Sequence, residues 1–146
     1  MLSFLFYNLL KNPSTYQAAQ RQVDEVIGHG PITIDHMSKL PYIEACLRET
    51  LRLTPTAPAF TLQTRPDTTE DPILLGGKWE VKKGTPIIAI LPKIHKDPAV
   101  YGPDAESFKP ERMLEEPFSK LPKNAWKPFG NGMRGCIGRP FAWQGR

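Results

Sequence analysis

Cysteine and histidine are scarce in this sequence, and their scarcity excludes several kinds of site. The 146 residues contain two cysteines, Cys46 and Cys136, which lie far apart and show no paired spacing. Neither a disulfide framework nor a CxxC metal site is therefore indicated. The three histidines, His29, His36 and His95, share no ligand spacing, which argues against zinc. We expect an intracellular, cytoplasmic protein, with membrane attachment of a longer parent left open.

The sequence also lacks long hydrophobic runs and blocks of like charge. Residues 1–10 are apolar but too short to span a bilayer, and they have neither a basic flank nor a cleavage site of small residues. We interpret them as the final turns of a buried helix. The net charge of +4 comes from scattered lysines and arginines without interleaved aromatics. Nucleic acid is therefore not expected as a partner, and the mildly basic surface suits either solvent or an acidic redox partner.

Proline is abundant, and its distribution divides the chain. The 16 prolines are about twice the usual share and concentrate after Leu53. The earlier part predicts a helix from Asn12-Pro13 to Ile27, with Asn12 as its N-cap, and a second from Tyr42 to Leu53. The later part predicts strands at 60–64, 79–81 and 86–91, loops with short helical turns over 92–128, and a last helix from Gly138 or Arg139. The expected fold class is mainly α with small β-sheets (α+β).

The most distinctive segment is the run Phe129–Gly138, FGNGMRGCIG, which we name the cysteine loop. Its glycines let the backbone adopt positive φ and approach a flat ligand closely. Backbone N–H groups around the sulfur of Cys136 would favour the thiolate, and Arg134 offers a fork suited to carboxylates. A thiolate beside such an arginine suits an iron porphyrin with propionate arms. We interpret Cys136 as a haem iron ligand, the alternative being a surface loop with a buried, inert cysteine.

A second pattern lies on the predicted Tyr42–Leu53 helix. Glu49 and Arg52 are three residues apart and so share one helix face. Alone, such a pair is a weak surface ion pair. The downstream segment Phe108–Met113 contains Arg112, which could bring a second guanidinium to the same carboxylate and offset its burial.

The cysteine loop resembles the haem-binding signature of the cytochrome P-450 family, Phe-x-x-Gly-x-Arg-x-Cys-x-Gly, with every fixed position matched. The resemblance implies haem b (iron protoporphyrin IX) with the Cys136 thiolate as axial ligand. It assigns cofactor contacts to Phe129, Gly130, Arg134, Cys136, Ile137 and Gly138. Backbone N–H groups near Ile137 and Gly138 are expected to donate to the sulfur. The indole of Trp126 is expected to donate to a neighbouring acceptor, a propionate being one candidate.

The resemblance also gives roles to residues outside the cysteine loop. Glu49, Arg52 and Arg112 are expected to form the family's structural ion network, with Met113 standing where phenylalanine is usual. The stretch LRLTPTAPAF, residues 51–60, is most similar to the fatty-acid-hydroxylating, reductase-fused subgroup. It implies that Ala57, Pro58 and Ala59 line the substrate channel. The alternative is a proline-rich connector in which the alanines merely pack.

The implied function is that of a monooxygenase, which inserts one oxygen atom of O2 into an apolar substrate such as a fatty acid. Its electrons would come from NADPH through an FAD- and FMN-containing flavin reductase, either separate or fused. The family's acid–threonine pair is not found, so no catalytic residue is assigned. We therefore expect residues 1–146 to be part of a single haem domain truncated at both ends. Such a chain would retain haem weakly and expose apolar surface around Phe4, Phe6 and Leu10. The alternatives are a non-catalytic remnant and a peroxide-using haem-thiolate enzyme.

Overall fold

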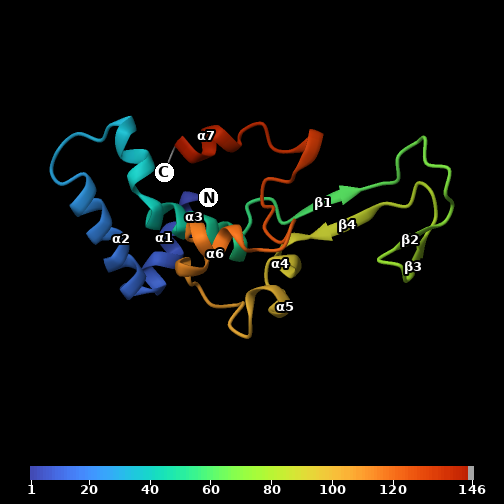
Figure 1. Ribbon diagram of the computed structural model, residues 1–146, viewed down its shortest axis with the longest axis horizontal. Helices are drawn as coiled ribbons and strands as arrows, with labels where there is room; N and C mark the ends of the chain where they lie inside the picture. The colour runs from blue at the N-terminus through green and yellow to red at the C-terminus, as the bar shows by residue number, and fades with distance from the viewer. Residues whose placement is uncertain (145–146) are drawn as a thin grey trace.

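Helices gather at one end of the molecule, and two small sheets extend from the other (Figure 1). The computed structural model describes residues 1–144. Its longer helices are α1 (Leu2–Lys11), α2 (Pro13–Val26) and α3 (Pro41–Leu53). Its shorter ones are α4 (Leu91–Ile94), α5 (Pro98–Tyr101), α6 (Glu115–Ser119) and α7 (Arg139–Gln144), with 3₁₀ helices η1 (Ile34–Lys39), η2 (Pro110–Met113) and η3 (Gly132–Arg134). The expected mainly α fold with small sheets is confirmed.

Helix α3 is the central element, because α1, α2 and η2 all pack against it. Pro41 occupies its first turn, where a missing N–H costs nothing. The helix ends before Pro55, which disfavours helical backbone in the preceding residue, and the N–H of Thr54 closes the last turn on the carbonyl of Thr50 at 2.8 Å. Two apolar clusters form around α3. One contains Leu5, Leu9, Ala19, Cys46 and Leu47, and the other contains Ala45, Tyr101, Ala105 and Met113.

The junction of α1 and α2 differs from the sequence prediction in one detail. Pro13 does begin α2, but Asn12 makes no side-chain cap. Instead its Nδ2 donates to the carbonyl of Asn8 at 2.8 Å. Asn12 is also the C-cap of α1, so its side chain satisfies a carbonyl at the end of that helix, while its Oδ1 caps no N–H of α2. The exposed side chains of α1 include Phe4, Phe6 and Leu10, as the sequence predicted.

Two separate antiparallel pairs form the sheets. Strand β1 (Ala59–Leu62) pairs with β4 (Ile87–Ile90), with Ala59 opposite Ile90. Strand β2 (Ile73–Leu75) pairs with β3 (Trp79–Val81) through a turn in which Gly76 and Gly77 both have positive φ. The sequence indicated β1, β3 and β4 but not β2, because three residues between Pro72 and Gly76 are too few for a periodic pattern.

Candidate functional site

The cysteine loop is closed by backbone hydrogen bonds within it. The N–H of Cys136 donates to the carbonyl of Phe129 at 2.8 Å, and the N–H of Gly135 donates to that of Gly132 at 3.0 Å. Gly130 and Gly132 adopt φ of +66° and +64°, which L residues with a side chain rarely adopt. The chain thus turns back on itself and leaves the Cys136 side chain exposed.

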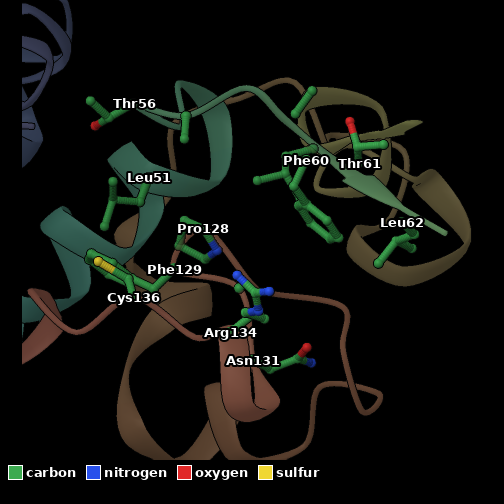
Figure 2. A pocket seen from close by; sticks show the side chains of 14 residues that line it. Leu51, Thr56, Phe60, Thr61, Leu62, Pro128, Phe129, Asn131, Arg134 and Cys136 are labelled. Carbon is green, nitrogen blue, oxygen red and sulfur yellow. The ribbon is translucent and has the colours of Figure 1, made fainter. Parts of the chain in front are cut away.

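A pocket of about 540 Å³ opens beside this loop, within the range typical of ligand sites. Its lining residues come from the end of α3 and the segment after it, from β1, from α4, and from the cysteine loop with the proline before it. They are Leu51, Thr56, Ala57, Ala59, Phe60, Thr61, Leu62, Leu91, Pro128, Phe129, Gly130, Asn131, Arg134 and Cys136. Figure 2 shows Cys136 and Leu51 towards one end of this pocket, with Thr61 and Leu62 towards the other. Most of the wall is apolar, and Arg134 is its cationic residue.

Most of the predicted site residues line this pocket, but three do not. Phe129, Gly130, Arg134, Cys136, Ala57 and Ala59 all contribute to the wall. Ile137 does not, because its side chain projects into solvent with 99% of its surface exposed. Pro58 is also outside the lining; its carbonyl instead accepts the N–H of Leu91 at 2.9 Å, which joins β1 to α4. Gly138 lies behind the sulfur, where an added Cβ would stand 3.7 Å from Cys136 Sγ.

Two expected hydrogen bonds around the cysteine loop have different partners or none. Within residues 1–144, no N–H donates to Cys136 Sγ, so the donors predicted near Ile137 and Gly138 are not found there. The indole Nε1–H of Trp126 donates to the backbone carbonyl of Arg48 at 3.0 Å. Since an indole has one donor, this bond to α3 takes the place of the propionate contact. Trp126 thereby attaches the segment before the loop to the central helix.

The structure brings Glu49, Arg52 and Arg112 together in one buried cluster, which we name the ion network. Arg52 forms two parallel bonds to Glu49, from Nε to Oε2 at 2.7 Å and from Nη2 to Oε1 at 2.8 Å. Arg112 Nε donates to Glu49 Oε1 at 3.1 Å. Both Glu49 and Arg52 are 0% exposed. A bidentate pair with a second cation offsets part of the cost of burying these charges.

The remaining donors of the two arginines bind backbone carbonyls, and Arg112 Nη2 also lies 3.2 Å from the Asp104 carboxylate. Arg52 donates to the carbonyls of His95 (2.8 Å), Ala105 (2.6 Å) and Ser107 (3.1 Å). Arg112 donates to those of Tyr101 (2.8 Å) and Asp104 (3.2 Å). The ion network therefore ties α3 to the whole segment from α4 to η2. None of its three residues lines the pocket.

Some residues of the site were missed by sequence reasoning. His95 is buried, and its Nε2 accepts the N–H of Lys127, the residue two before the cysteine loop, at 3.1 Å. Burial lowers the pKa of His95 to about 4, with the cations Arg52 and Lys127 acting in the same direction. Phe60 and Leu62 line the pocket from β1, and Lys127 Nζ lies 5.9 Å from the Phe60 ring centroid. The position of Phe60 and Leu62 on a predicted strand directly after the proposed channel residues was the available signal, whereas nothing local marked His95.

The second cysteine has a different environment from Cys136. Cys46 lies on α3 and is buried in the apolar cluster that α3 forms with α1 and α2. Burial, together with the nearby charges of Glu111 and Glu49, raises the pKa of its thiol to about 12. It is therefore an unreactive thiol at neutral pH. Among residues 1–144, no three histidine, cysteine or acidic side chains gather where they could hold a bare metal ion. In the same residues, no helix has both the length and the apolar character needed to cross a membrane.

Comparison with known proteins gives the family. The family model described as "Cytochrome P-450" matches residues 1–144. This chain belongs to the cytochrome P-450 family. It is 64% identical over 145 residues to a bifunctional cytochrome P-450/NADPH–P-450 reductase of Aspergillus oryzae. It is 63% identical over 143 residues to a self-sufficient cytochrome P-450 monooxygenase of Oidiodendron maius, and 60% identical over 144 residues to one of Exserohilum turcicum.

These alignments cover nearly all of the chain but little of each relative. The shares of this chain that align are 98%, 98% and 99%, whereas each alignment spans 13% of the relative's length. The likeness therefore describes one segment of a cytochrome P-450, and the names of the relatives describe much longer proteins.

Family membership implies haem, and the residues of the pocket fit it. An exposed thiol supplies the soft donor that iron accepts, and mostly apolar side chains surround it. Arg134 lines the same pocket and forms no ion pair within residues 1–144, so its guanidinium is available to a carboxylate. A thiol, an apolar wall and an available cation match the iron, macrocycle and propionates of haem b.

Proposed function

We propose that this chain forms the cysteine-ligand side of a haem-thiolate monooxygenase, as part of a single haem domain spanning residues 1–146 and extending beyond them. The observation that carries the proposal is the joint presence of Cys136 and Arg134 in the wall of one apolar pocket. The chemistry that a bound haem supplies is the activation of O2, with a thiolate ligand favouring O–O cleavage.

The predicted residues of the haem site and of the ion network have the following roles in this proposal. Cys136 binds the iron as a thiolate, and Arg134 binds a propionate. Phe129 and Gly130 pack against the macrocycle from the same loop, while the small Gly138 leaves room behind the sulfur. Glu49, Arg52 and Arg112 hold α3 against the segment from α4 to η2. Ile137 contributes its backbone, since its side chain faces solvent.

The proposed substrate is an apolar molecule, and specifically a fatty acid. Ala57, Ala59 and Phe60 supply the apolar wall that would face such a chain. Electrons would come from NADPH through a flavin reductase carrying FAD and FMN. The names of two relatives support this source, since one is a bifunctional cytochrome P-450/NADPH–P-450 reductase and another is called self-sufficient. Incubation of the full protein with NADPH and fatty acids, followed by mass spectrometry of hydroxylated products, tests the substrate class.

The ligand assignment is tested by replacing each cysteine in turn. In the haem-loaded protein, the reduced CO complex is expected to show the red-shifted Soret band of thiolate ligation. Cys136→Ser should abolish this band, because serine offers no thiolate. Cys46→Ala is the matched control and should keep it, since Cys46 is buried in a different cluster. A red-shifted band that persists in Cys136→Ser contradicts the assignment.

A further inference from the structure

His95 is a buried side chain that the proposed chemistry does not use. It follows α4 directly and is 0% exposed. Its backbone is anchored on both sides: its N–H donates to the carbonyl of Leu91 at 2.8 Å, and its own carbonyl accepts from Arg52 Nη1 at 2.8 Å. The backbone of His95 is thus attached to the ion network, and these two backbone bonds hold the residue in place independently of any contact of its ring.

The ring's hydrogen bond determines its protonation state. The backbone N–H of Lys127 can only donate, so the Nε2 atom that accepts it at 3.1 Å must carry no hydrogen. The hydrogen of the neutral ring is therefore on Nδ1, which is buried and makes no hydrogen bond of normal geometry within the described residues. A protonated ring would turn Nε2 into a donor facing another donor, and the bond to Lys127 would be lost.

The charges around His95 also oppose protonation. Arg52 approaches from α3 and Lys127 from the segment before the cysteine loop, and both are cations. Lys96, next to His95 in sequence, is paired with Glu106 at 2.9 Å. Burial and the two cations lower the pKa of His95 to about 4, although the nearby carbonyls of Arg52 and Leu51 act in the opposite direction. The ring is therefore neutral in the folded protein at pH 7.

Lys127 is connected to the cysteine by a short series of backbone bonds. Its carbonyl accepts the N–H of Gly130 at 3.0 Å, and the carbonyl of Phe129 accepts the N–H of Cys136 at 2.8 Å. Pro128 and Phe129, the next two residues, line the pocket. The place where His95 holds Lys127 thus affects where the sulfur lies.

We propose that His95 is a positioning residue of the haem-ligand loop, whose neutral imidazole holds the backbone of Lys127 and thereby holds Cys136 in place. The positioning of Cys136 as a ligand rests on the proposed function, whereas the attachment of the loop does not. His95 thereby links two segments: its ring accepts from Lys127, just before the cysteine loop, and its backbone carbonyl accepts from Arg52 of the ion network.

The test uses two substitutions with different predicted effects and one control. His95→Gln keeps an oxygen that can accept the N–H of Lys127 but does not titrate. His95→Phe fills similar volume and offers no acceptor. The control is His29→Gln, because His29 is exposed in the loop after α2. Hydrogen exchange at the Lys127 amide is measured in the full chain with haem and again without it, and is expressed as a protection factor so that the intrinsic pH dependence is removed.

At pH 7, His95→Phe is expected to lower the protection of the Lys127 amide at least about tenfold, whereas His95→Gln and His29→Gln stay within about threefold of the original chain. With haem, His95→Phe should also reduce the fraction of CO complex with the red-shifted Soret band, and His95→Gln should restore it. Unchanged protection in His95→Phe overturns the proposal.

The pH dependence gives a second, independent comparison. When the loop opens, His95 regains a pKa near 6.5, whereas in the closed state it is about 4. The closed loop is therefore fully stabilised above pH 6.5 and loses up to about tenfold in protection for each unit as pH falls towards 4. His95→Gln should remove this slope; if it keeps the slope, His95 is not its source. Because this comparison uses only the original chain and His95→Gln, it tests the proposal even if His95→Phe does not fold.

The outcome is separable from that of the proposed function. Exchange without haem reports attachment of the loop alone. If Cys136→Ser keeps the red-shifted band, the ligand assignment fails, yet the exchange results still decide whether His95 holds Lys127.

Discussion

At the scale of single residues, Arg52 illustrates how a charge can be buried completely. Its five N–H groups have five acceptors: two oxygens of Glu49 and the carbonyls of His95, Ala105 and Ser107. Glu49 in turn accepts from Arg112 and from the backbone N–H of Lys109 at 3.0 Å. Because each group is satisfied, the cost of desolvation is offset, and removing any one partner leaves the others uncompensated.

Replacing Glu49 is therefore expected to be severe. Glu49→Gln leaves Arg52 as a buried cation without its counter-ion and should lower the free energy of unfolding by about 3–5 kcal/mol. Urea denaturation followed by circular dichroism measures the loss. Glu115→Gln is the matched control. The Glu115 carboxylate is mostly exposed and lies 3.4 Å from Arg48, so its loss should cost less than about 1 kcal/mol. Equal losses in the two variants would contradict the role assigned to burial.

At the scale of elements, two glycine turns have similar backbones and different surroundings. Gly130 in the cysteine loop and Gly76 in the β2–β3 turn have φ of +66° and +61°. An added Cβ at Gly130 would meet no atom closer than 3.9 Å, and one at Gly76 would meet nothing within 4 Å. Strain from an alanine at either position would thus come from the backbone rather than from a clash.

Alanine at these two turns is expected to separate stability from ligand binding. Gly130→Ala and Gly76→Ala should each destabilise the chain by about 1–2 kcal/mol, the cost of left-handed backbone in a residue with a Cβ. Only Gly130→Ala should also weaken haem binding, because only that turn carries pocket residues. Thermal unfolding and haem titration measure the two effects. Equal weakening of haem binding by Gly76→Ala would contradict the claim that only the turn at Gly130 supports the haem pocket.

At the scale of the whole molecule, most helices lie at one end and the two sheets extend from the other (Figure 1). The pocket is lined by residues of both helices and strands (Figure 2). The end of α3, strand β1 and the cysteine loop each supply part of the wall. At the helical end, α1 buries Leu5 and Leu9 but exposes Phe4, Phe6 and Leu10. Phe6 and Leu10, one helical turn apart, share an exposed apolar face of the kind that promotes association.

We expect the 146-residue chain to self-associate through this face of α1. Sedimentation velocity over a range of concentrations should show oligomers, and the double substitution Phe6→Ser with Leu10→Gln should shift the distribution towards monomer without lowering the unfolding temperature. Ile34→Ser is the control, since Ile34 is at least as exposed as Phe6 and Leu10 but lies in η1. A distribution that is monomeric at all concentrations would contradict the expectation.

Some of the site was predictable because its signals are local. The cysteine loop could be recognised from glycines, an arginine and a cysteine within ten residues, and the bounds of α3 from Pro41 and Pro55. The pairing of Glu49 with Arg52 followed from their three-residue spacing on a helix. The roles expected of Pro58 and Ile137 stay predictions; neither residue lines the pocket, because the direction of a side chain in an irregular segment depends on what packs against it.

The sequence by itself determined the longer helices, the strands other than β2 and the turn that carries Cys136, since backbone preferences and periodicity act over a few residues. Only the tertiary structure decided the partners that lie far along the chain. The carbonyls that bind Arg52 are 43 to 55 residues away, Trp126 finds its acceptor 78 residues away, and His95 meets Lys127 across 32 residues. A backbone carbonyl or N–H is present at nearly every position, so residue type cannot say which one is chosen. Packing around α3 makes that choice, because it alone brings these groups within bonding distance.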